Sequence, residues 1–220
     1  MTVALDFSDV LPYWRLLVSG AGVTMALTAV SALTGVTVGT ACAWCNTFGP
    51  RWPRPLVGAY VEAIRNTPFI VQLFFIFFGL PSLGVKLSET TAAVLAMTVN
   101  LGAYSAEIIR AGIEAVPKGH IEAAECLAMT RLQVFRHVVL AQAFRKIYPA
   151  LSSQIVIVML GSAVVSQISV EDLTYAANFV QSRTFRGFEA YIIATIAYLG
   201  LAIVLRAALR GVGRLVLGRG

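Results

Sequence analysis

An uncharged stretch near the start of the sequence constrains the fold more than any other feature. No Asp, Glu, Lys or Arg lies between Arg15 and Arg51, although a membrane-spanning helix needs only about 20 apolar residues. The stretch is rich in Gly, Ala, Ser and Thr, which let helices pack closely in lipid. It is too long for the apolar part of a secretion signal, and Met1 to Asp9 hold no Lys or Arg. We therefore expect a permanent membrane span that starts near Leu16.

Four more apolar segments follow, and the composition agrees with a membrane environment. The chain is 58% hydrophobic and 13% charged, whereas soluble domains carry about 25% charged residues. We expect one all-α domain over residues 1–220, an integral membrane bundle of five transmembrane helices. The expected spans cover about residues 16–48, 56–80, 90–113, 147–168 and 191–209.

The basic residues are divided unequally between the two sides that these spans define. With the N-terminus outside, the outer segments hold Arg15, Lys86, Arg183 and Arg186. The cytoplasmic segments then hold Arg51, Arg54, Lys118, Arg131, Arg136, Arg145, Lys146, Arg206, Arg210, Arg214 and Arg219. Since cytoplasmic loops carry an excess of Lys and Arg, we expect an N-out, C-in orientation. The net charge of +6 then reflects membrane placement, and no nucleic-acid partner is expected.

Three of these arginines form a stripe near the C-terminus. Arg206, Arg210 and Arg214 recur every four residues, so a helix places them on one face. Two interpretations remain open: the stripe anchors the helix to anionic lipid headgroups, or it contacts a partner protein.

Residues 117–137 form a polar segment on the cytoplasmic side. Pro117 suits a first helical turn, and a short amphipathic helix follows it with Ile121 and Ala124 on one face. Thr130 and Gln133 fit a capping box, which predicts that a second helix starts there. By physics alone, the segment is either an interfacial helix that covers the bundle or a docking site for a cytoplasmic partner.

The same segment resembles the EAA loop of ABC importer permeases. Glu122, Ala123 and Ala124 supply its first three residues, and Leu140 matches near its end. The three departures are Ala128 for a glycine, Val138 for an isoleucine and Ala141 for a proline. We interpret the first departure as a turn that does not depend on glycine.

Three further stretches extend the resemblance over most of the chain. Residues 63–69 (AIRNTPF), followed by Gln72 and Leu73, are similar to the second span of polar amino-acid permeases. Residues 100–110 are similar to their third span, and residues 169–173 (SVEDL) to an outer loop. The chain is thus identified as a member of the polar amino-acid ABC transporter permeases, which are subunits of type I, binding-protein-dependent importers.

This resemblance implies a set of partners and a place in the cell. It implies a dimer of cytoplasmic ATP-binding subunits, a second permease subunit (identical or homologous), an external solute-binding protein, a polar amino acid and membrane lipid, in the inner membrane of a bacterium. The residues expected to dock the ATPase are Gly119, Ile121, Glu122, Ala123, Ala124, Leu127, Ala128, Met129 and Thr130. Because the chain has no GxxxxGK[ST] motif, ATP and Mg²⁺ are expected on the partner and no cofactor on this chain.

Charged residues inside the expected spans are candidates for function, because an unpaired charge in lipid costs several kcal/mol. The possible pairs are Arg65 with Glu107, Glu62 with Arg65, and Glu107 with Arg110. Ion pairs that only hold the bundle together remain the alternative.

Pro68 lies in the middle of the second expected span. It lacks an N–H group and strains the carbonyl about one turn earlier, so backbone polar groups near Arg65 need other partners. Broken helices in transporters often present such groups to substrate, and arginine binds a carboxylate through two hydrogen bonds. A proline kink used only for packing is the alternative.

The candidate substrate-binding residues follow from this kink and from the resemblance. They are Arg65, Asn66, Thr67, Phe69, Asn100, Gln154 and Ser162. Gln154 stands where the family often has a glutamate that reads a cationic side chain. We therefore hypothesise that this contact does not demand a cationic substrate.

Other classes of function fit the sequence less well. No His or Cys forms a metal-binding or nucleophilic motif with a carboxylate, so neither an enzyme nor a metal site is expected. A passive channel needs no docking helix, and it remains the alternative together with a permease for another small polar solute.

Overall fold

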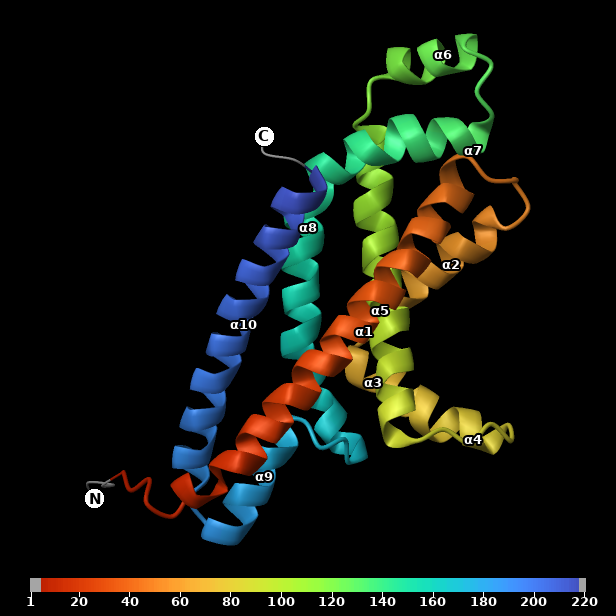
Figure 1. Ribbon diagram of the computed structural model, residues 1–220. Helices are drawn as coiled ribbons and strands as arrows, with labels where there is room; N and C mark the ends of the chain where they lie inside the picture. Colours follow the sequence, from red (N-terminus) through yellow and green to blue (C-terminus); the bar gives the residue numbers. More distant parts are fainter. Residues whose placement is uncertain (1–4, 218–220) are drawn as a thin grey trace.

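The computed structural model describes residues 5–217, and every regular element within that range is helical (Figure 1). The expected all-α class is therefore confirmed for the described residues. Residues 1–4 and 218–220, with Arg219 of the expected cytoplasmic set, lie outside them. Four helical segments are long and apolar enough to cross a membrane, or up to five if a bent helix pair counts as one span.

The elements follow one another without strands in the described chain. They are η1 (Leu11–Tyr13), α1 (Trp14–Thr47), α2 (Arg54–Arg65), α3 (Phe69–Phe74), η2 (Phe75–Gly79), α4 (Leu80–Ser82), α5 (Glu89–Glu114), α6 (Lys118–Cys126), α7 (Arg131–Gln133), η3 (Val134–Val139), α8 (Leu140–Gly161), η4 (Ser162–Ile168), α9 (Leu173–Thr184) and α10 (Gly187–Leu217).

Helices α1 and α5 form the most extensive helix pair of the molecule. Small residues make this close approach possible, as expected for helices in lipid. A Cβ atom added to Gly35 would lie 2.9 Å from the Cβ of Leu101, and one added to Gly39 would lie 2.5 Å from the Cβ of Ser105. The two backbones therefore meet along a seam that admits no larger side chain at either glycine.

The second expected span, residues 56–80, is broken near Pro68, where the sequence predicts an interruption of the helix. Helices α2 and α3 are bent by 114° at the break. Asn66 has already left the helical conformation with φ −101° and ψ 7°, and Pro68 is extended with φ −64° and ψ 140°. The physical reason is the one that the sequence suggested: Pro68 cannot donate a helical hydrogen bond.

Two other spans differ from their expected bounds. Helix α8 begins at Leu140, seven residues before the expected start at 147, and α10 covers Gly187–Leu217 instead of 191–209. Helix α8 includes Arg145 and Lys146 before its apolar part, and α10 includes Glu189 in its first turn and Arg210 and Arg214 after its apolar part. Residues 170–187, between the fourth and fifth expected spans, contain α9, whose N-cap Asp172 accepts a hydrogen bond from the Tyr175 backbone N–H.

The polar segment 117–137 contains the short helices that the sequence predicted. Helix α6 lies at the upper end of the molecule in Figure 1, together with α7. The capping box is confirmed, since the Thr130 N–H donates to Oε1 of Gln133 at 2.8 Å and the Gln133 N–H donates to Oγ1 of Thr130 at 3.4 Å. Ala128 has φ 56°, so the turn keeps the left-handed conformation of a glycine turn although glycine is absent.

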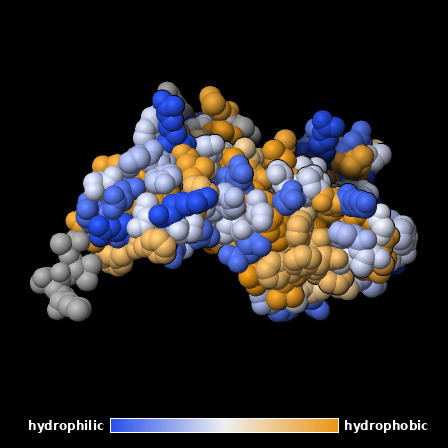
Figure 2. Space-filling model, turned by 90° about the horizontal axis from the view of Figure 1, so that it is seen from below, coloured by the Kyte–Doolittle hydropathy of each residue, from blue (hydrophilic) through white to orange (hydrophobic). Residues whose placement is uncertain are grey.

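The opposite end carries α9 and the α4 turn. Figure 2 views this end from below, and hydrophilic residues interrupt the apolar surface there. Such mixed surface is expected where helices leave the apolar part of a membrane.

Candidate functional site

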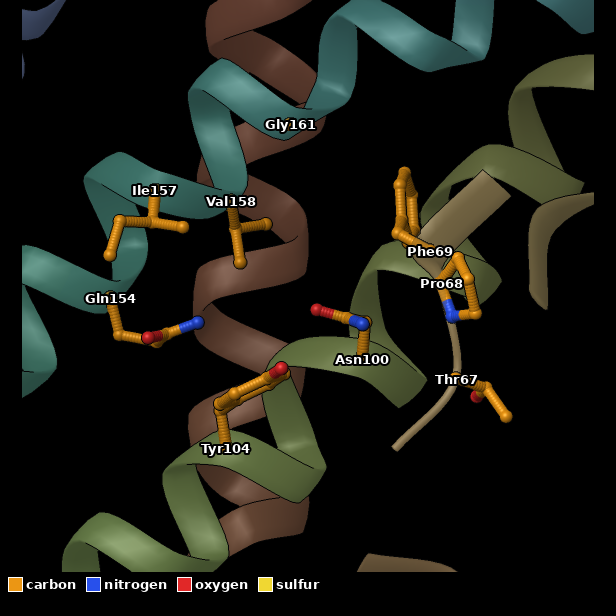
Figure 3. A pocket seen from close by; sticks show the side chains of 9 residues that line it. All are labelled: Thr67, Pro68, Phe69, Asn100, Tyr104, Gln154, Ile157, Val158 and Gly161. Carbon is orange, nitrogen blue, oxygen red and sulfur yellow. The ribbon is translucent and has the colours of Figure 1, made fainter. Parts of the chain in front are cut away.

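A pocket of about 400 Å³ lies where the second span breaks. Three structural elements line it: the break itself, the middle of α5 and the end of α8 (Figure 3). Its lining residues are Thr67, Pro68, Phe69, Asn100, Tyr104, Gln154, Ile157, Val158 and Gly161. The pocket thus combines an apolar wall from α8 and Phe69 with hydroxyl and amide groups, and none of these lining residues is charged.

Gln72 holds the break together. Its side chain is 7% exposed, and its Nε2 donates to the carbonyl oxygens of Ile64 at 2.7 Å and Thr67 at 3.0 Å. These carbonyls lie where the missing N–H of Pro68 and the bend interrupt the helical hydrogen-bond pattern. One side-chain amide therefore replaces backbone hydrogen bonds, as broken helices within membranes require.

The same glutamine orients Asn100 in the pocket wall. Nδ2 of Asn100 donates to Oε1 of Gln72 at 3.0 Å, so the amide of Asn100 has a fixed direction. Figure 3 shows the amides of Asn100 and Gln154 facing each other across the pocket, with an oxygen of Asn100 and a nitrogen of Gln154 turned toward the same space. This arrangement offers one acceptor and one donor to a polar ligand.

Arg65, the last residue of α2, lies just beyond the pocket and next to a row of charged residues on α5. Its Nη1 is 3.9 Å from Oε1 of Glu107, and its guanidinium carbon is 5.7 Å from the centre of the Tyr104 ring. Glu107 also accepts from Arg110 at 2.6 Å, and Arg110 pairs with Glu114. The expected pairs Arg65–Glu107 and Glu107–Arg110 are therefore confirmed, while the ion pairs found in residues 5–217 do not include Glu62 with Arg65.

Four of the seven predicted site residues line the pocket, namely Thr67, Phe69, Asn100 and Gln154. Arg65 does not line it but touches its wall through Tyr104.

Asn66 and Ser162 do not line this pocket. The amide of Asn66 donates back to the Glu62 carbonyl at 2.9 Å. Ser162 is fully buried and donates to the Met159 carbonyl at 2.6 Å. The chain changes from α-helix to 3₁₀-helix at Ser162, so its neighbour Gly161 faces the pocket instead.

Sequence reasoning missed several residues of this site. Tyr104 and Gln72 both stood inside the stretches that carried the family resemblance, and a single glutamine in the apolar run 69–78 was a usable signal. Ile157, Val158 and Gly161 carried no such signal, because apolar and small residues fill the whole fourth span.

The predicted docking segment presents two different faces. Gly119, Glu122, Ala123, Leu127, Ala128 and Thr130 are exposed, whereas Ile121 and Met129 are half-buried and Ala124 is buried. The inner face packs on the apolar cluster around Phe135. Leu127 is 78% exposed, and a Cβ atom added to Gly119 would meet no atom within 4 Å. The exposed face of this segment therefore makes few contacts within the chain and is accessible to a partner.

The end of the bundle that carries α9 is fixed around a buried carboxylate. Asp172 is fully buried, and it accepts from the Tyr175 N–H at 2.8 Å and the Tyr198 hydroxyl at 3.2 Å. Burial raises the pKa of Asp172 from 3.8 to about 6. The next residue, Leu173, donates its N–H to Oγ1 of Thr24. The segment at the start of α9 is therefore tied to both α1 and α10.

Comparison with known proteins identifies the family to which this architecture belongs. Residues 35–217 match the family model described as the binding-protein-dependent transport system inner membrane component. The chain belongs to this family. It is 35% identical to the arginine transport system permease protein ArtQ of Bacillus subtilis (strain 168), over 91% of this chain and 92% of the relative. It is 31% identical to the glutamine transport system permease protein GlnP of Escherichia coli (strain K12), over 95% of this chain and 96% of the relative.

Solved structures agree with the family. The crystal structure of an amino acid ABC transporter with histidines covers 96% of this chain and 99% of its own, with a TM-score of 0.85 and 37% identity. An inward-facing structure of the methionine ABC transporter MetNI shares the fold, with a TM-score of 0.76 at 22% identity, over 93% of this chain and 98% of its own. The expected membership in the amino-acid ABC permeases is confirmed. As a permease subunit of this family, the chain is not an enzyme, because the ATPase is a separate subunit.

Proposed function

We propose that this permease subunit passes a polar amino acid through the pocket between the broken second span, α5 and α8. The observation that carries the proposal is the pair of amides on Asn100 and Gln154 that face the same space beside a helix break. Two named relatives, which transport arginine and glutamine, support the amino-acid class.

Arg65 is proposed to receive the α-carboxylate of the substrate. Its ion pair with Glu107 is long, at 3.9 Å, and its side chain is 40% exposed. A carboxylate can bind the guanidinium through two hydrogen bonds, which is stronger than one long contact. Substrate therefore draws Arg65 toward the pocket and away from Glu107.

The substrate side chain is proposed to be polar and uncharged. The pocket walls supply hydroxyl and amide groups from Thr67, Asn100, Tyr104 and Gln154, with no carboxylate among the lining residues. A cationic side chain that left water for this pocket would lack an opposite charge.

The remaining parts of the proposal concern orientation and assembly. We propose five spans, N-out and C-in, in the inner membrane of a bacterium, because the basic loops gather at the end that carries α6. The outer face of residues 119–130 docks a dimer of ATP-binding subunits, whose closure alternates access to the pocket. A second permease subunit completes the pathway, and an external solute-binding protein delivers the amino acid.

ATP-dependent uptake of a panel of radiolabelled amino acids tests the proposal. The permease would be reconstituted in proteoliposomes with its ATPase and binding protein. We expect uptake of a neutral polar amino acid and a loss of at least tenfold in Arg65→Ala, while the binding protein still stimulates ATP hydrolysis. Arg206→Ala, which changes an exposed arginine of α10, serves as the control and should retain uptake.

Two outcomes would reject parts of the proposal. Solute flux that does not depend on ATP would favour a passive channel, and uptake of a different small polar solute would remove the amino-acid class. Gln154→Glu tests the neutral pocket, because it adds a carboxylate where a cationic side chain would need one. Unchanged selectivity in Gln154→Glu would remove Gln154 from the determinants of specificity.

A further inference from the structure

Two pockets of different character lie next to each other at the end that carries α6. The first, here called the basic pocket, has a volume of about 400 Å³ and is lined by Thr47, Phe48, Gly49, Pro50, Arg51, Arg54, Glu125 and Arg131. The second, here called the apolar groove, has a volume of about 370 Å³ and is lined by Val36, Thr37, Thr40, Ala41, Trp44 and Phe135. Phe48 of the first packs on Phe135 of the second, with ring centres 5.6 Å apart, so the two spaces adjoin.

The basic pocket carries an excess of positive charge. Three arginines and one glutamate line it, and the ion pairs found in residues 5–217 involve none of the four. Arg54 donates through Nη2 to the carbonyl oxygens of Thr47 at 3.2 Å and Gly49 at 3.1 Å. Those acceptors leave its charge uncompensated. Its Nε is buried and has no partner among the described residues. An anion would complete this site.

The apolar groove lies deeper along α1 and has little polar character. The hydroxyls of Thr37 and Thr40 donate to the carbonyls of Leu33 and Val36 on their own helix, at 2.7 and 2.8 Å. Because the two hydroxyls are already paired, both threonines contribute mainly apolar methyl groups to the lining of the groove. From Trp44 to Val36, α1 covers about 12 Å at 1.5 Å per residue. That length accommodates a substantial part of a lipid acyl chain.

Two tryptophans mark the depth of these pockets in the membrane. Trp52 is 76% exposed and follows Arg51 directly, and Trp44 lines the apolar groove. Tryptophan is enriched where hydrocarbon meets the headgroups. The basic pocket thus lies at headgroup depth, and the apolar groove extends from it toward the hydrocarbon.

We propose that an anionic phospholipid binds here, with its phosphate in the basic pocket and one acyl chain in the apolar groove. A zwitterionic lipid fits less well, because its own ammonium group adds to the arginine charges. A free anion would use only the first of the two pockets. Arg54 is the first residue of α2 and Arg51 lies in the connection just before it, whereas Glu125 and Arg131 flank the turn between α6 and α7 (Figure 1). A bound phosphate therefore bridges the broken span to the proposed docking segment.

Native mass spectrometry of the full chain in mild detergent tests the proposal. Purified protein would be titrated with phosphatidylglycerol or with phosphatidylcholine. We expect selective retention of phosphatidylglycerol, with an apparent affinity about thirtyfold weaker in Arg51→Gln/Arg131→Gln, since each basic residue near a lipid headgroup strengthens binding severalfold. Both arginines are exposed, so the variant is expected to fold. The matched control is Arg15→Gln/Arg183→Gln, two exposed arginines on α1 and α9 at the opposite end of the molecule, which should bind like the wild type.

A second arm separates a lipid from a free anion. Ala41→Trp fills the apolar groove from an exposed position and leaves the arginines in place. It should weaken phosphatidylglycerol binding at least tenfold. The thermal stability of the wild type should rise with phosphatidylglycerol and stay unchanged with inorganic phosphate. Equal retention of the two lipids, wild-type binding by the double arginine variant, or equal stabilisation by inorganic phosphate would each overturn the proposal. Because no arm measures transport, this result is independent of the proposed function.

Discussion

Helix α5 contacts two regions that meet the demands of a membrane in different ways. On one side, the α1–α5 seam is close because glycines let the backbones meet, and the hydroxyls of Thr34 and Thr98 form a hydrogen bond across it at 2.7 Å. On the other, the broken second span leaves backbone carbonyls without helical partners, and the amide of Gln72 binds them. The seam tolerates no added volume, whereas the break contains a pocket. The comparison teaches that the scaffold and the candidate site share one helix but depend on different interactions.

The largest expected effect is on the seam. Gly39→Leu would place a Cβ 2.5 Å from the Cβ of Ser105 and 2.8 Å from the backbone nitrogen of Ala106. Because backbone atoms cannot give way, we expect a loss of about 3 kcal/mol or more in the free energy of unfolding. Thermal unfolding in detergent measures it. Gly22→Leu, on the same helix with no atom within 4 Å of the added Cβ, is the control, and equal unfolding temperatures for the two variants would contradict this view of the seam.

A substitution at the break should reduce transport more than it reduces stability. Gln72→Leu removes the donor to Ile64 and Thr67 and the acceptor for Asn100. We expect at least a tenfold loss of uptake and a loss of about 1–3 kcal/mol in the free energy of unfolding, the usual cost of unpaired buried polar groups. Gln167→Leu, at an exposed glutamine outside the pocket, should retain both. A Gln72→Leu protein with normal uptake would mean that the orientation of Asn100 is irrelevant.

The end of the bundle that carries α9 is a third kind of region, and its stability should depend on pH. Burial raises the pKa of Asp172 from 3.8 to about 6, so the folded state binds more protons than the unfolded state between these values. The contribution of Asp172 to stability is therefore full below about pH 4 and is lost as the pH rises through 6. We expect this loss to be on the order of 2 kcal/mol. Thermal unfolding from pH 4 to 7 measures it, and Asp172→Asn should remove this part of the pH dependence. An identical pH profile in the variant would exclude Asp172 as its source.

The smallest expected effect is a gain in the free energy of unfolding, from a substitution in the proposed docking segment. Ala128 has φ 56°, a left-handed conformation that costs a residue with a Cβ about 1 kcal/mol relative to glycine. Ala128→Gly should therefore raise the free energy of unfolding by up to about 1 kcal/mol. Ala123→Gly, in the interior of α6, should lower it by about the same amount. Equal signs for the two variants would contradict the assigned turn.

The long helices could be predicted because hydropathy and length alone place a span in lipid. The angle of the break could not, because it depends on how Gln72 reaches back to Ile64 across the bend. Helix α9 was missed because its residues do not form an apolar run, although Asp172 is a strong N-cap residue.

The candidate site was predictable where a proline interrupts a span and where polar residues stand out, as at Thr67, Asn100 and Gln154. It was not predictable at Ser162, where the change from α-helix to 3₁₀-helix decides which residue faces the pocket. A shift of one residue along the helix is enough to put Gly161 in the pocket lining in place of Ser162.

Uptake by Gly161→Phe tests the central claim most directly. Gly161 lines the pocket, and a Cβ added to it meets no atom within 4 Å, so the phenyl ring can fill the pocket without disturbing the fold. Gly200→Phe, at a position of α10 that is equally free of contacts, is the matched control. Our account predicts that Gly161→Phe unfolds like the wild type, keeps ATP hydrolysis stimulated by the binding protein, and loses ATP-dependent uptake, while Gly200→Phe retains all three. Uptake at the wild-type rate by a folded Gly161→Phe protein would contradict the claim that substrate passes through this pocket.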